Sequence, residues 1–395
     1  MAMMPTQSTG AGYFSNFDLS RVPSPCFVID EFRLQENLQV IRQIADASGC
    51  HILLALKAFS MWSLAPLVSD YLQGCCASGL WEAKLARAHY GGHLSTYAPA
   101  YKSNEIVEIA ALSDHVIFNS PAQIERYAAA AQAGGAQAGL RINPQHSEGH
   151  IATYDPCAPG SRLGWPLDKM PETSLTGITG LHIHTLCEQQ FPPLKRTWAA
   201  MQDPLAALAA RMQGQFEWLN LGGGHLLTHP DYDRDRLVAL LTGIKQKFGV
   251  QTYLEPGTAV AFDAGILVGE VLDMTENDGP IAVLDVSATC HMPDVLEAPY
   301  RPALMQELPA NKADSTPIRL TGPSCLAGDV IGEYALPRHL QAGDRLAFLD
   351  QAHYSMVKTT SFNGVGLPAM AIWNSQTDNL RLVREFSYQD FESRL

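Results

Sequence analysis

The feature that most constrains the fold of this chain is an alternation of short apolar runs with amphipathic stretches, from residue 31 to about residue 257. Short apolar runs bounded by turn residues are typical of buried strands, and the amphipathic stretches between them are typical of helices. This alternation favours a parallel sheet covered by helices. The apolar runs lie at residues 52–56, 75–78, 95–98, 116–119, 140–143, 181–184, 218–221 and 253–255. Eight such units predict an α/β fold, a (β/α)8 TIM-like barrel over residues 31–260.

One helix between these runs has clear boundary signals. Ser120 is a good N-cap, Pro121 fits the first helical position and Gln123 lies where a capping box needs it. Gly134 and Gly135 end the helix. By contrast, the prolines between residues 144 and 166 leave little room for a long helix, so we expect a functional loop there.

After residue 260 the pattern changes to strand-like segments without long helices. These segments lie at residues 266–272, 281–286, 318–321, 345–349, 369–373 and 380–383. They predict a second, mainly β domain formed by residues 261–395, to which we assign residues 1–30 as well. A chain of 395 residues with 46% hydrophobic side chains can bury both cores.

The charge balance excludes some partners. The chain carries 27 Lys and Arg against 40 Asp and Glu, so it would repel a nucleic acid, whereas a cationic substrate is compatible with it. We find no signal peptide and no apolar stretch long enough to span a membrane, and therefore expect a cytoplasmic protein. The eight cysteines have no paired metal-ligand spacing, so we expect reduced thiols and no metal site.

Polar residues gather at the carboxyl ends of the predicted barrel strands, where enzymes with this fold place their active sites. They are Lys57, Ser78, Asn143, His184, Gly222 to Gly224 and Glu255. Lys57 ends the apolar run His-Ile-Leu-Leu-Ala-Leu, so we expect a partly desolvated, nucleophilic amine, although a lysine can simply mark a strand end.

The other rim residues also have two interpretations each. Gly222 to Gly224 could cradle an anionic group with backbone N–H groups or make a plain turn. Glu255 could pair with a protonated heterocyclic nitrogen, which improves a cofactor ring as an electron sink, or act as a cap. His184 could stack on such a ring or be a satisfied core residue, and His182 has the same ambiguity.

Taken together, several ordered motifs resemble the fold-type III pyridoxal-phosphate decarboxylases, which have an alanine-racemase-like barrel and a β domain. The similarity runs from about Pro25 to Trp373 and is strongest to the branch that decarboxylates carboxynorspermidine and carboxyspermidine. The motifs are Leu-Ala-Leu-Lys-Ala-Phe-Ser at 54–60, Cys-Ala-Pro-Gly-Ser-Arg-Leu-Gly at 157–164, His-Ile-His-Thr-Leu-Cys-Glu at 182–188, Leu-Asn-Leu-Gly-Gly-Gly-His at 219–225, Ala-Thr-Cys-His-Met-Pro-Asp-Val-Leu-Glu at 288–297, Gly-Pro-Ser-Cys-Leu-Ala-Gly-Asp at 322–329 and His-Tyr-Ser-Met at 353–356.

The resemblance implies pyridoxal 5'-phosphate as cofactor. Lys57 would hold it covalently, His184 would stack on its ring and Glu255 would pair with the ring nitrogen. The glycine triplet and Tyr354 would bind the phosphate. From its place at the same strand-end rim, we also expect Ser78 to contact the cofactor.

The resemblance further implies a homodimer with shared active sites. Cys325 would lie near the reacting carbon of the partner subunit's substrate and act as proton donor, and Asp329 would lie near the substrate amine. The product would be norspermidine or spermidine, so the enzyme would serve polyamine biosynthesis.

Two departures from the wider family affect the site. Thr258 follows Glu-Pro-Gly where those enzymes usually have an arginine for the phosphate, so phosphate binding must rely on backbone and hydroxyl donors. Asp294 and Glu297 stand where diaminopimelate decarboxylases have an arginine, which favours a cationic substrate tail. Alternatively, these acids form a solvated turn neutralised by Arg301.

Three other functions remain open from the sequence. The chain could decarboxylate another basic amino acid or diaminopimelate, or it could be a non-catalytic pyridoxal-phosphate-binding protein. A racemase fits less well, because Glu255 would favour a protonated ring and hence loss of carbon dioxide. Carboxynorspermidine and carboxyspermidine differ by one methylene, worth only about 1–3 kcal/mol in a pocket, so the sequence does not decide between them.

Overall fold

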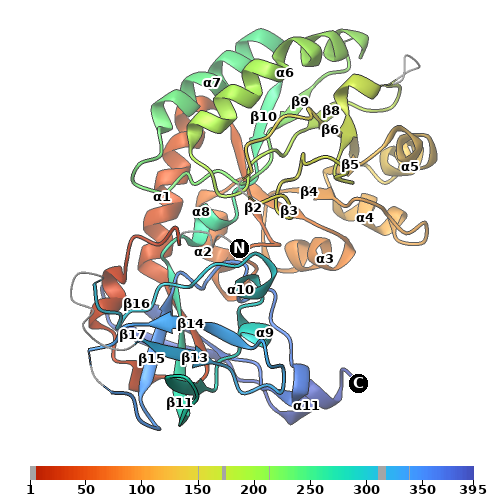
Figure 1. Cartoon of the computed structure of the whole chain (residues 1–395). Helices are drawn as coiled ribbons and strands as arrows, with labels where there is room; N and C mark the ends of the chain where they lie inside the picture. Colours follow the sequence, from red (N-terminus) through yellow and green to blue (C-terminus); the bar gives the residue numbers. More distant parts are fainter. Residues whose placement is uncertain (1–5, 150, 171–174, 213, 310–316, 338) are drawn as a thin grey trace. The chain divides into compact units, whose positions relative to one another are not determined.

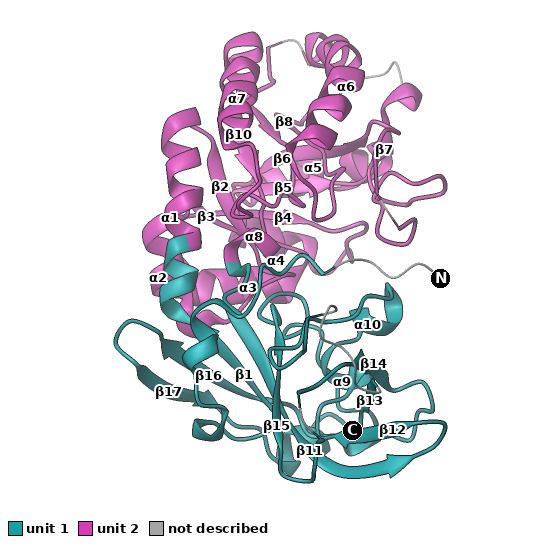
Figure 2. Cartoon of the chain, turned by 60° about the vertical axis from the view of Figure 1, so that its left-hand side comes forward, with its two compact units in different colours: residues 1–36, 261–395 teal, residues 37–260 magenta. Residues whose placement is uncertain are grey.

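The computed structural model describes residues 6–149, 151–170, 175–212, 214–309, 317–337 and 339–395. The chain divides into two compact units, shown in Figure 2: residues 37–260, here called the barrel unit, and residues 1–36 with 261–395, here called the sheet unit. The sequence predicted a domain boundary between residues 30 and 31, at the start of helix α1 (Glu31–Ser48). The two units of the structure divide between Glu36 and Asn37, inside this helix.

Eight parallel strands form a closed ring in the described part of the barrel unit, which confirms the predicted barrel. In ring order they pair as β2-β3-β4-β5-β6-β8-β9-β10, and β10 returns to pair with β2. Each corresponds to one of the eight apolar runs. Their bounds are β2 His51–Ala55, β3 Gly74–Ala77, β4 His93–Tyr97, β5 His115–Phe118, β6 Gln137–Asn143, β8 Gly180–His182, β9 Trp218–Asn220 and β10 Gln251–Leu254.

Helices lie around the outside of these strands (Figure 1). They are α1, α2 Ala65–Tyr71, α3 Leu80–His89, α4 Ile106–Leu112, α5 Pro121–Ala133, α6 Phe191–Arg211 and α7 Arg234–Phe248, with α8 Thr258–Ala261 after the last strand and a 3-10 turn at Trp62–Leu64. Across the described residues, no helix combines the length and apolar character that a membrane span requires.

The connection between β6 and β8 is the irregular one, as the prolines predicted. Its described residues form only the short strand β7 (Trp165–Pro166), which pairs with β6, and a 3-10 turn at Leu167–Lys169. Asn119 holds this connection against the barrel, because its side-chain oxygen accepts the N–H of Gly164 at 2.6 Å and its amide donates to the carbonyl of Arg162 at 2.8 Å.

Helix α5 begins and ends where its sequence predicted. The Ser120 hydroxyl accepts the N–H of Gln123. The Gln123 side chain, however, accepts the N–H of Asn119 at 2.9 Å, one residue before the cap, so the reciprocal bond of an ordinary capping box is shifted by one residue.

The amino ends of the barrel strands enclose a layer of aromatic and histidine rings. His115 stacks on Trp218 with ring centroids 4.0 Å apart, and His93 meets His115 edge-on at 4.3 Å. Tyr253 lies against both histidines, at 5.1 Å from each. Burial lowers the pKa of His93 to about 4 and that of His115 to about 3, so both imidazoles are neutral near pH 7.

The sheet unit contains an eight-stranded sheet in the described residues, with the order β14-β13-β12-β11-β1-β16-β17 and β15 paired to β11. The bounds are β1 Cys26–Asp30, β11 Gly265–Glu276, β12 Pro280–Leu284, β13 Ile318–Thr321, β14 Val330–Tyr334, β15 Arg345–Leu349, β16 Ala369–Asn374 and β17 Asn379–Arg384. Short helices lie at α9 Ala288–His291, α10 Asp294–Glu297 and α11 Tyr388–Glu392, and 3-10 turns at Gly12–Asn16, Leu19–Arg21 and Phe362–Gly364.

The N-terminal segment is part of this sheet. Strand β1 lies between β11, to which it is antiparallel, and β16, to which it is parallel. Phe14 and Phe17 pack on Trp373 with ring centroids 5.4 and 4.9 Å apart, in the core of the sheet unit. Strand β1, Phe14 and Phe17 are therefore part of the sheet unit through pairing and packing.

The buried histidines predict how stability responds to acid. In the unfolded chain an imidazole titrates near its ordinary pKa of about 6.5, whereas folded His115 titrates near 3, so the unfolded state binds more protons between these values. The free energy of unfolding should therefore fall as the pH drops below about 6.5, by up to about 1.4 kcal/mol per pH unit for each such histidine.

His115→Phe should make the free energy of unfolding fall less steeply as the pH drops, because phenylalanine can stack on Trp218 but binds no proton. Denaturation at a series of pH values between 7 and 4 measures the slope. His89→Phe, at an exposed histidine, is the control and should keep the wild-type slope. If the free energy of unfolding falls as steeply with pH in His115→Phe as in the wild type, burial of this imidazole does not govern acid sensitivity.

Candidate active site

Lys57 lies directly after β2, at the carboxyl rim of the barrel. Its neighbours Leu56 and Ala58 are buried, but the Lys57 side chain itself is exposed. Lys57 thus stands in an exposed turn directly after a buried strand, and the nucleophilic character of its amine stays a prediction. Among the described residues Lys57 has no ion-pair or hydrogen-bond partner, which leaves its amine available for a ligand.

Glu255 follows β10 and is buried, and two neighbouring strands supply hydrogen-bond donors to its carboxylate. His182 Nε2 lies 3.1 Å from Glu255 Oε2, and the side-chain amide of Asn220 donates to Oε1 at 2.7 Å. Burial alone would raise the pKa of Glu255, but His182, Asn220 and the charge of Lys57 outweigh it, so the pKa lies below its ordinary value. The site therefore holds an ionised carboxylate in its interior.

His184 lies close to both the glycine triplet and Glu255. Its Nδ1 accepts the N–H of Gly223 at 3.2 Å, and burial together with the Lys57 charge holds the pKa of its imidazole well below the ordinary value. One ring nitrogen of His182, one ring nitrogen of His184 and one carboxylate oxygen of Glu255 all lie within 4.8 Å of one another. The structure thus brings His184, Glu255 and the glycine triplet together, as the sequence predicted.

Close backbone approach explains why the triplet consists of glycine. A Cβ on Gly223 would lie 2.3 Å from the carbonyl oxygen of Glu255, and one on Gly224 would lie 2.2 Å from that of Leu186. Gly222 and Gly224 also have positive φ angles of 69° and 82°. The N–H of Gly224 has no partner among the described residues, whereas those of Gly222 and Gly223 donate to Asn220 and His184.

Thr258 has a partner that the sequence did not reveal. Its hydroxyl donates to Glu188 Oε1 at 2.8 Å, and Glu188 has a positive φ of 50°. The Thr258 hydroxyl is therefore engaged by a carboxylate, and the donors that would replace an arginine at the phosphate stay a prediction. Ser78, at the end of β3, donates its N–H to Glu82 at 2.6 Å.

Three interior residues near the site were missed from the sequence. The ring of Tyr97 stacks on His182 with centroids 5.5 Å apart and planes 15° apart, and its hydroxyl donates to Asn119 at 2.6 Å. The Arg141 guanidinium lies 4.6 Å from the centre of the Tyr97 ring and has no carboxylate within ion-pair distance in the described chain. Asn220 is the third. Strand alternation places each of them inside the barrel, and that periodicity was the available signal.

The remaining predicted residues belong to the sheet unit. Cys325 is exposed on the loop between β13 and β14, where its N–H donates to the side chain of Asn363 at 2.8 Å. Asp329 is buried, and its carboxylate accepts the hydroxyls of Ser287 at 2.8 Å and Ser324 at 2.6 Å. Tyr354 lies in a turn with a positive φ of 51°.

Asp294 and Glu297 form a cluster around a lysine. The ammonium of Lys358 donates to both carboxylates, and these partners raise its pKa although burial opposes them. The sequence had suggested Arg301 as the neutralising residue, and this was wrong, because Arg301 pairs with Glu307 at 2.8 Å. In the contacts of Lys358, two carboxylates share one ammonium.

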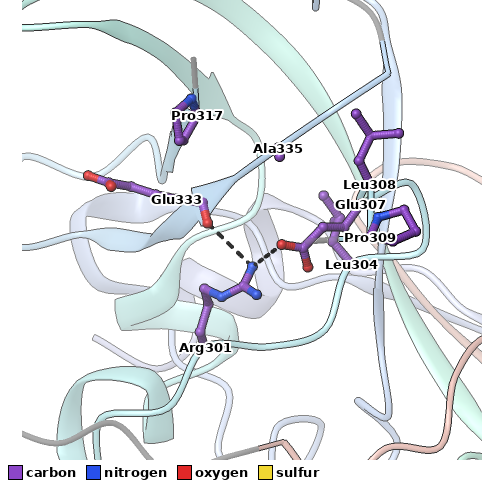
Figure 3. Close-up of a pocket in the computed structure, with 8 residues that line it drawn as sticks. All are labelled: Arg301, Leu304, Glu307, Leu308, Pro309, Pro317, Glu333 and Ala335. Carbon is purple, nitrogen blue, oxygen red and sulfur yellow. Dashed lines mark hydrogen bonds and ion pairs between the residues drawn. The ribbon is translucent and has the colours of Figure 1, made fainter. Parts of the chain in front are cut away.

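Figure 3 shows a pocket of about 690 Å³ in the sheet unit, where Arg301 points toward Glu307. Its other lining residues are Leu304, Leu308, Pro309, Pro317, Glu333 and Ala335. None of the predicted cofactor or substrate residues lines it, so this pocket is separate from the strand-end site.

Comparison with known proteins identifies the family. A family model described as "Pyridoxal-dependent decarboxylase, C-terminal sheet domain" matches residues 26–352. The chain is 38% identical over 384 residues to the carboxynorspermidine/carboxyspermidine decarboxylase of Campylobacter jejuni, covering 95% of this chain and 99% of the relative. It is 40% identical over 390 residues to the carboxyaminopropylagmatine decarboxylase of Synechocystis, covering 98% and 99%.

Solved structures agree with this relationship. The crystal structure of carboxynorspermidine decarboxylase from Campylobacter jejuni, complexed with norspermidine, superposes with a TM-score of 0.85 over 95% of this chain and all of that chain, at 38% identity. Diaminopimelate decarboxylase from Helicobacter pylori, complexed with L-lysine, shares the fold with a TM-score of 0.78 at 18% identity, over 95% and 98% of the two chains. The chain therefore belongs to the pyridoxal-dependent decarboxylases that combine an alanine-racemase-like barrel with a C-terminal sheet domain.

Proposed function

We propose that this protein decarboxylates a carboxylated triamine, carboxynorspermidine or carboxyspermidine, in polyamine biosynthesis. The observation that carries the proposal is the grouping of an unpaired Lys57, an ionised Glu255 and a glycine triplet at one rim of the barrel, in a chain whose near full-length relatives act on carboxylated polyamines. Bound pyridoxal phosphate supplies a ring that accepts the electron pair left when carbon dioxide departs.

The residues of the barrel unit fit this cofactor. The N–H of Gly224, without an acceptor among the described residues, is a donor available for the phosphate. Lys57 offers an unpaired amine for the covalent bond to the cofactor. Glu255 would hold a proton on the ring nitrogen by charge, and His184 would fix the ring plane. Ser78 would complete the cofactor contacts, and Tyr354 would add a phosphate contact.

Cys325 would return a proton to the substrate carbon after carbon dioxide leaves. Its exposure suits a residue that enters the site of a second copy of the chain, so we propose a homodimer with shared sites. We retain Asp329 as a residue near the substrate amine. Its hydrogen bonds to Ser287 and Ser324 also suit a role in holding the Cys325 loop. We further propose that the dimer is cytoplasmic.

Asp294 and Glu297 would recognise the cationic tail of the substrate. Because Lys358 neutralises only one of the two charges, the cluster can still attract a second ammonium group. The tail would share the carboxylates with Lys358 rather than replace it.

Carboxyaminopropylagmatine is a second candidate substrate. The observation that favours it is the 40% identity to the Synechocystis enzyme over 98% of this chain. By its name this compound ends in a guanidinium group, which suits the bidentate geometry of a carboxylate better than an ammonium does.

Carbon dioxide release tests the proposal directly. Purified protein would be given carboxynorspermidine, carboxyspermidine, carboxyaminopropylagmatine, diaminopimelate and ornithine separately, with Lys57→Ala as control. We expect release from the carboxylated triamines and none from Lys57→Ala, because the variant cannot bind the cofactor covalently. A clear preference for carboxyaminopropylagmatine would select the second candidate, and a preference for diaminopimelate or ornithine would reject both.

Gly224→Ala should weaken cofactor binding by about tenfold or more, because a Cβ would collide with the Leu186 carbonyl and displace the free N–H. Gly243→Ala is the matched control. This glycine lies inside α7 with nothing within 4 Å of the added Cβ, so affinity should not change. Fluorescence titration of the apoproteins with pyridoxal phosphate measures both, and wild-type affinity in Gly224→Ala would remove the triplet from phosphate binding.

Glu297→Ala should raise KM for the preferred triamine about two- to fivefold with little change in kcat, since a half-exposed ion pair is worth up to about 1 kcal/mol. Glu333→Ala is the control, because Glu333 is also 55% exposed and is paired, with Arg319, in the same unit. Steady-state kinetics compares the two variants. Equal KM values for Glu297→Ala and the wild type would exclude Glu297 from tail recognition.

A further inference from the structure

His182 lies on β8 at the bottom of the candidate site, and the resemblance to known enzymes assigned it no role. Only 1% of the residue is exposed, and its Nε2 lies 3.1 Å from Glu255 Oε2. Its other ring nitrogen, Nδ1, is buried and has no hydrogen-bond partner among the described residues. A proton on Nδ1 would therefore be unsatisfied, whereas a proton on Nε2 is donated to a carboxylate.

The surroundings of His182 fix the ring in this orientation. Tyr97 stacks on it with ring planes 15° apart, and the Tyr97 hydroxyl is itself held by Asn119. Burial disfavours a positive charge on His182, as do Arg141 over the Tyr97 ring and Lys57. Glu255 favours the charge but does not outweigh them, so the pKa of the imidazole lies below its ordinary value. His182 is thus a neutral hydrogen-bond donor that cannot easily rotate away from Glu255.

The carboxylate needs such a donor. A buried glutamate without partners binds a proton, because burial penalises its charged form. Glu255 receives only two side-chain hydrogen bonds in the described residues, one to each oxygen, from His182 and from Asn220. Removing the His182 bond would leave Oε2 without a donor in a buried site.

We propose that His182 is a positioning residue which keeps Glu255 ionised and aimed at the cofactor, so that the ring nitrogen stays protonated. The inference rests on the proposed pairing of Glu255 with that nitrogen. It adds a definite role for His182: the Nε2–H donor sets the charge of the carboxylate, and through it the strength of the ring as an electron sink.

Two substitutions separate this role from simple packing. In His182→Gln the side-chain amide nitrogen can take the place of Nε2 and donate to Glu255. In His182→Asn the shorter side chain places its amide near the position of Nδ1, out of reach of Glu255. Both variants are neutral and polar, so they differ mainly in the donor to the carboxylate.

The readout is the ¹⁵N chemical shift of the ring nitrogen in ¹⁵N-labelled pyridoxal phosphate bound to each protein, which reports whether this nitrogen carries a proton. We expect a protonated nitrogen in the wild type and in His182→Gln, and a neutral one in His182→Asn. The value of kcat should fall about 10–100-fold in His182→Asn, as for other residues that orient a catalytic group, and recover in His182→Gln.

A protonated ring nitrogen in His182→Asn would overturn the role of His182. A neutral nitrogen already in the wild type would instead overturn the pairing of Glu255 with the ring, so the two failures are distinguishable. Should His182→Asn not fold, the ¹⁵N spectrum of the wild-type imidazole decides. A proton on Nε2 supports the proposal, and a proton on Nδ1 contradicts it.

Discussion

The pairing of β10 with β2 is the interaction on which the rest of the barrel depends. It joins the last strand of the ring to the first through Tyr253 opposite His51 and Leu254 opposite Ile52. Closure places the carboxyl ends of all eight strands at one rim, so Lys57 after β2 and Glu255 after β10 become neighbours although about 200 residues separate them in sequence. The chemistry of the site follows from this geometry.

The electrostatics of the site follow from burial. Inside the barrel, histidines are neutral because burial penalises their charged form, and they can therefore act as hydrogen-bond donors or acceptors. Glu255 is the exception that stays charged, since His182 and Asn220 donate to it. A neutral histidine beside a charged carboxylate suits a site that must hold a proton on a ligand's ring nitrogen.

Much of the fold could be predicted because buried strands leave continuous apolar runs in the sequence. All eight barrel strands were found in this way, and so were six strands of the sheet unit. Two strands of the sheet unit were missed, as was the short strand β7 of the barrel unit. The run of β1 is buried along its whole length but precedes the repeating pattern, and β14 contains Gly332 and Glu333, which interrupt an apolar run.

The site was predicted less completely, because contacts between distant segments leave no local signal. Lys358 lies about 60 residues from Asp294 and Glu297, and its pairing with them could not be inferred from spacing. For Tyr97, Arg141 and Asn220, strand alternation was the available signal for an inward position, but it does not show which partners they contact there. The exposure of Lys57 depends on the turn after β2 rather than on the apolar run that precedes it.

We propose that the carboxyl rim of the barrel binds pyridoxal phosphate through Lys57. Borohydride reduction of the holoenzyme, followed by proteolysis and mass spectrometry, locates the lysine that holds the cofactor. We expect a phosphopyridoxyl group on the peptide that contains Lys57. The same group on another lysine, or none on any lysine of a protein that retains activity, would contradict it.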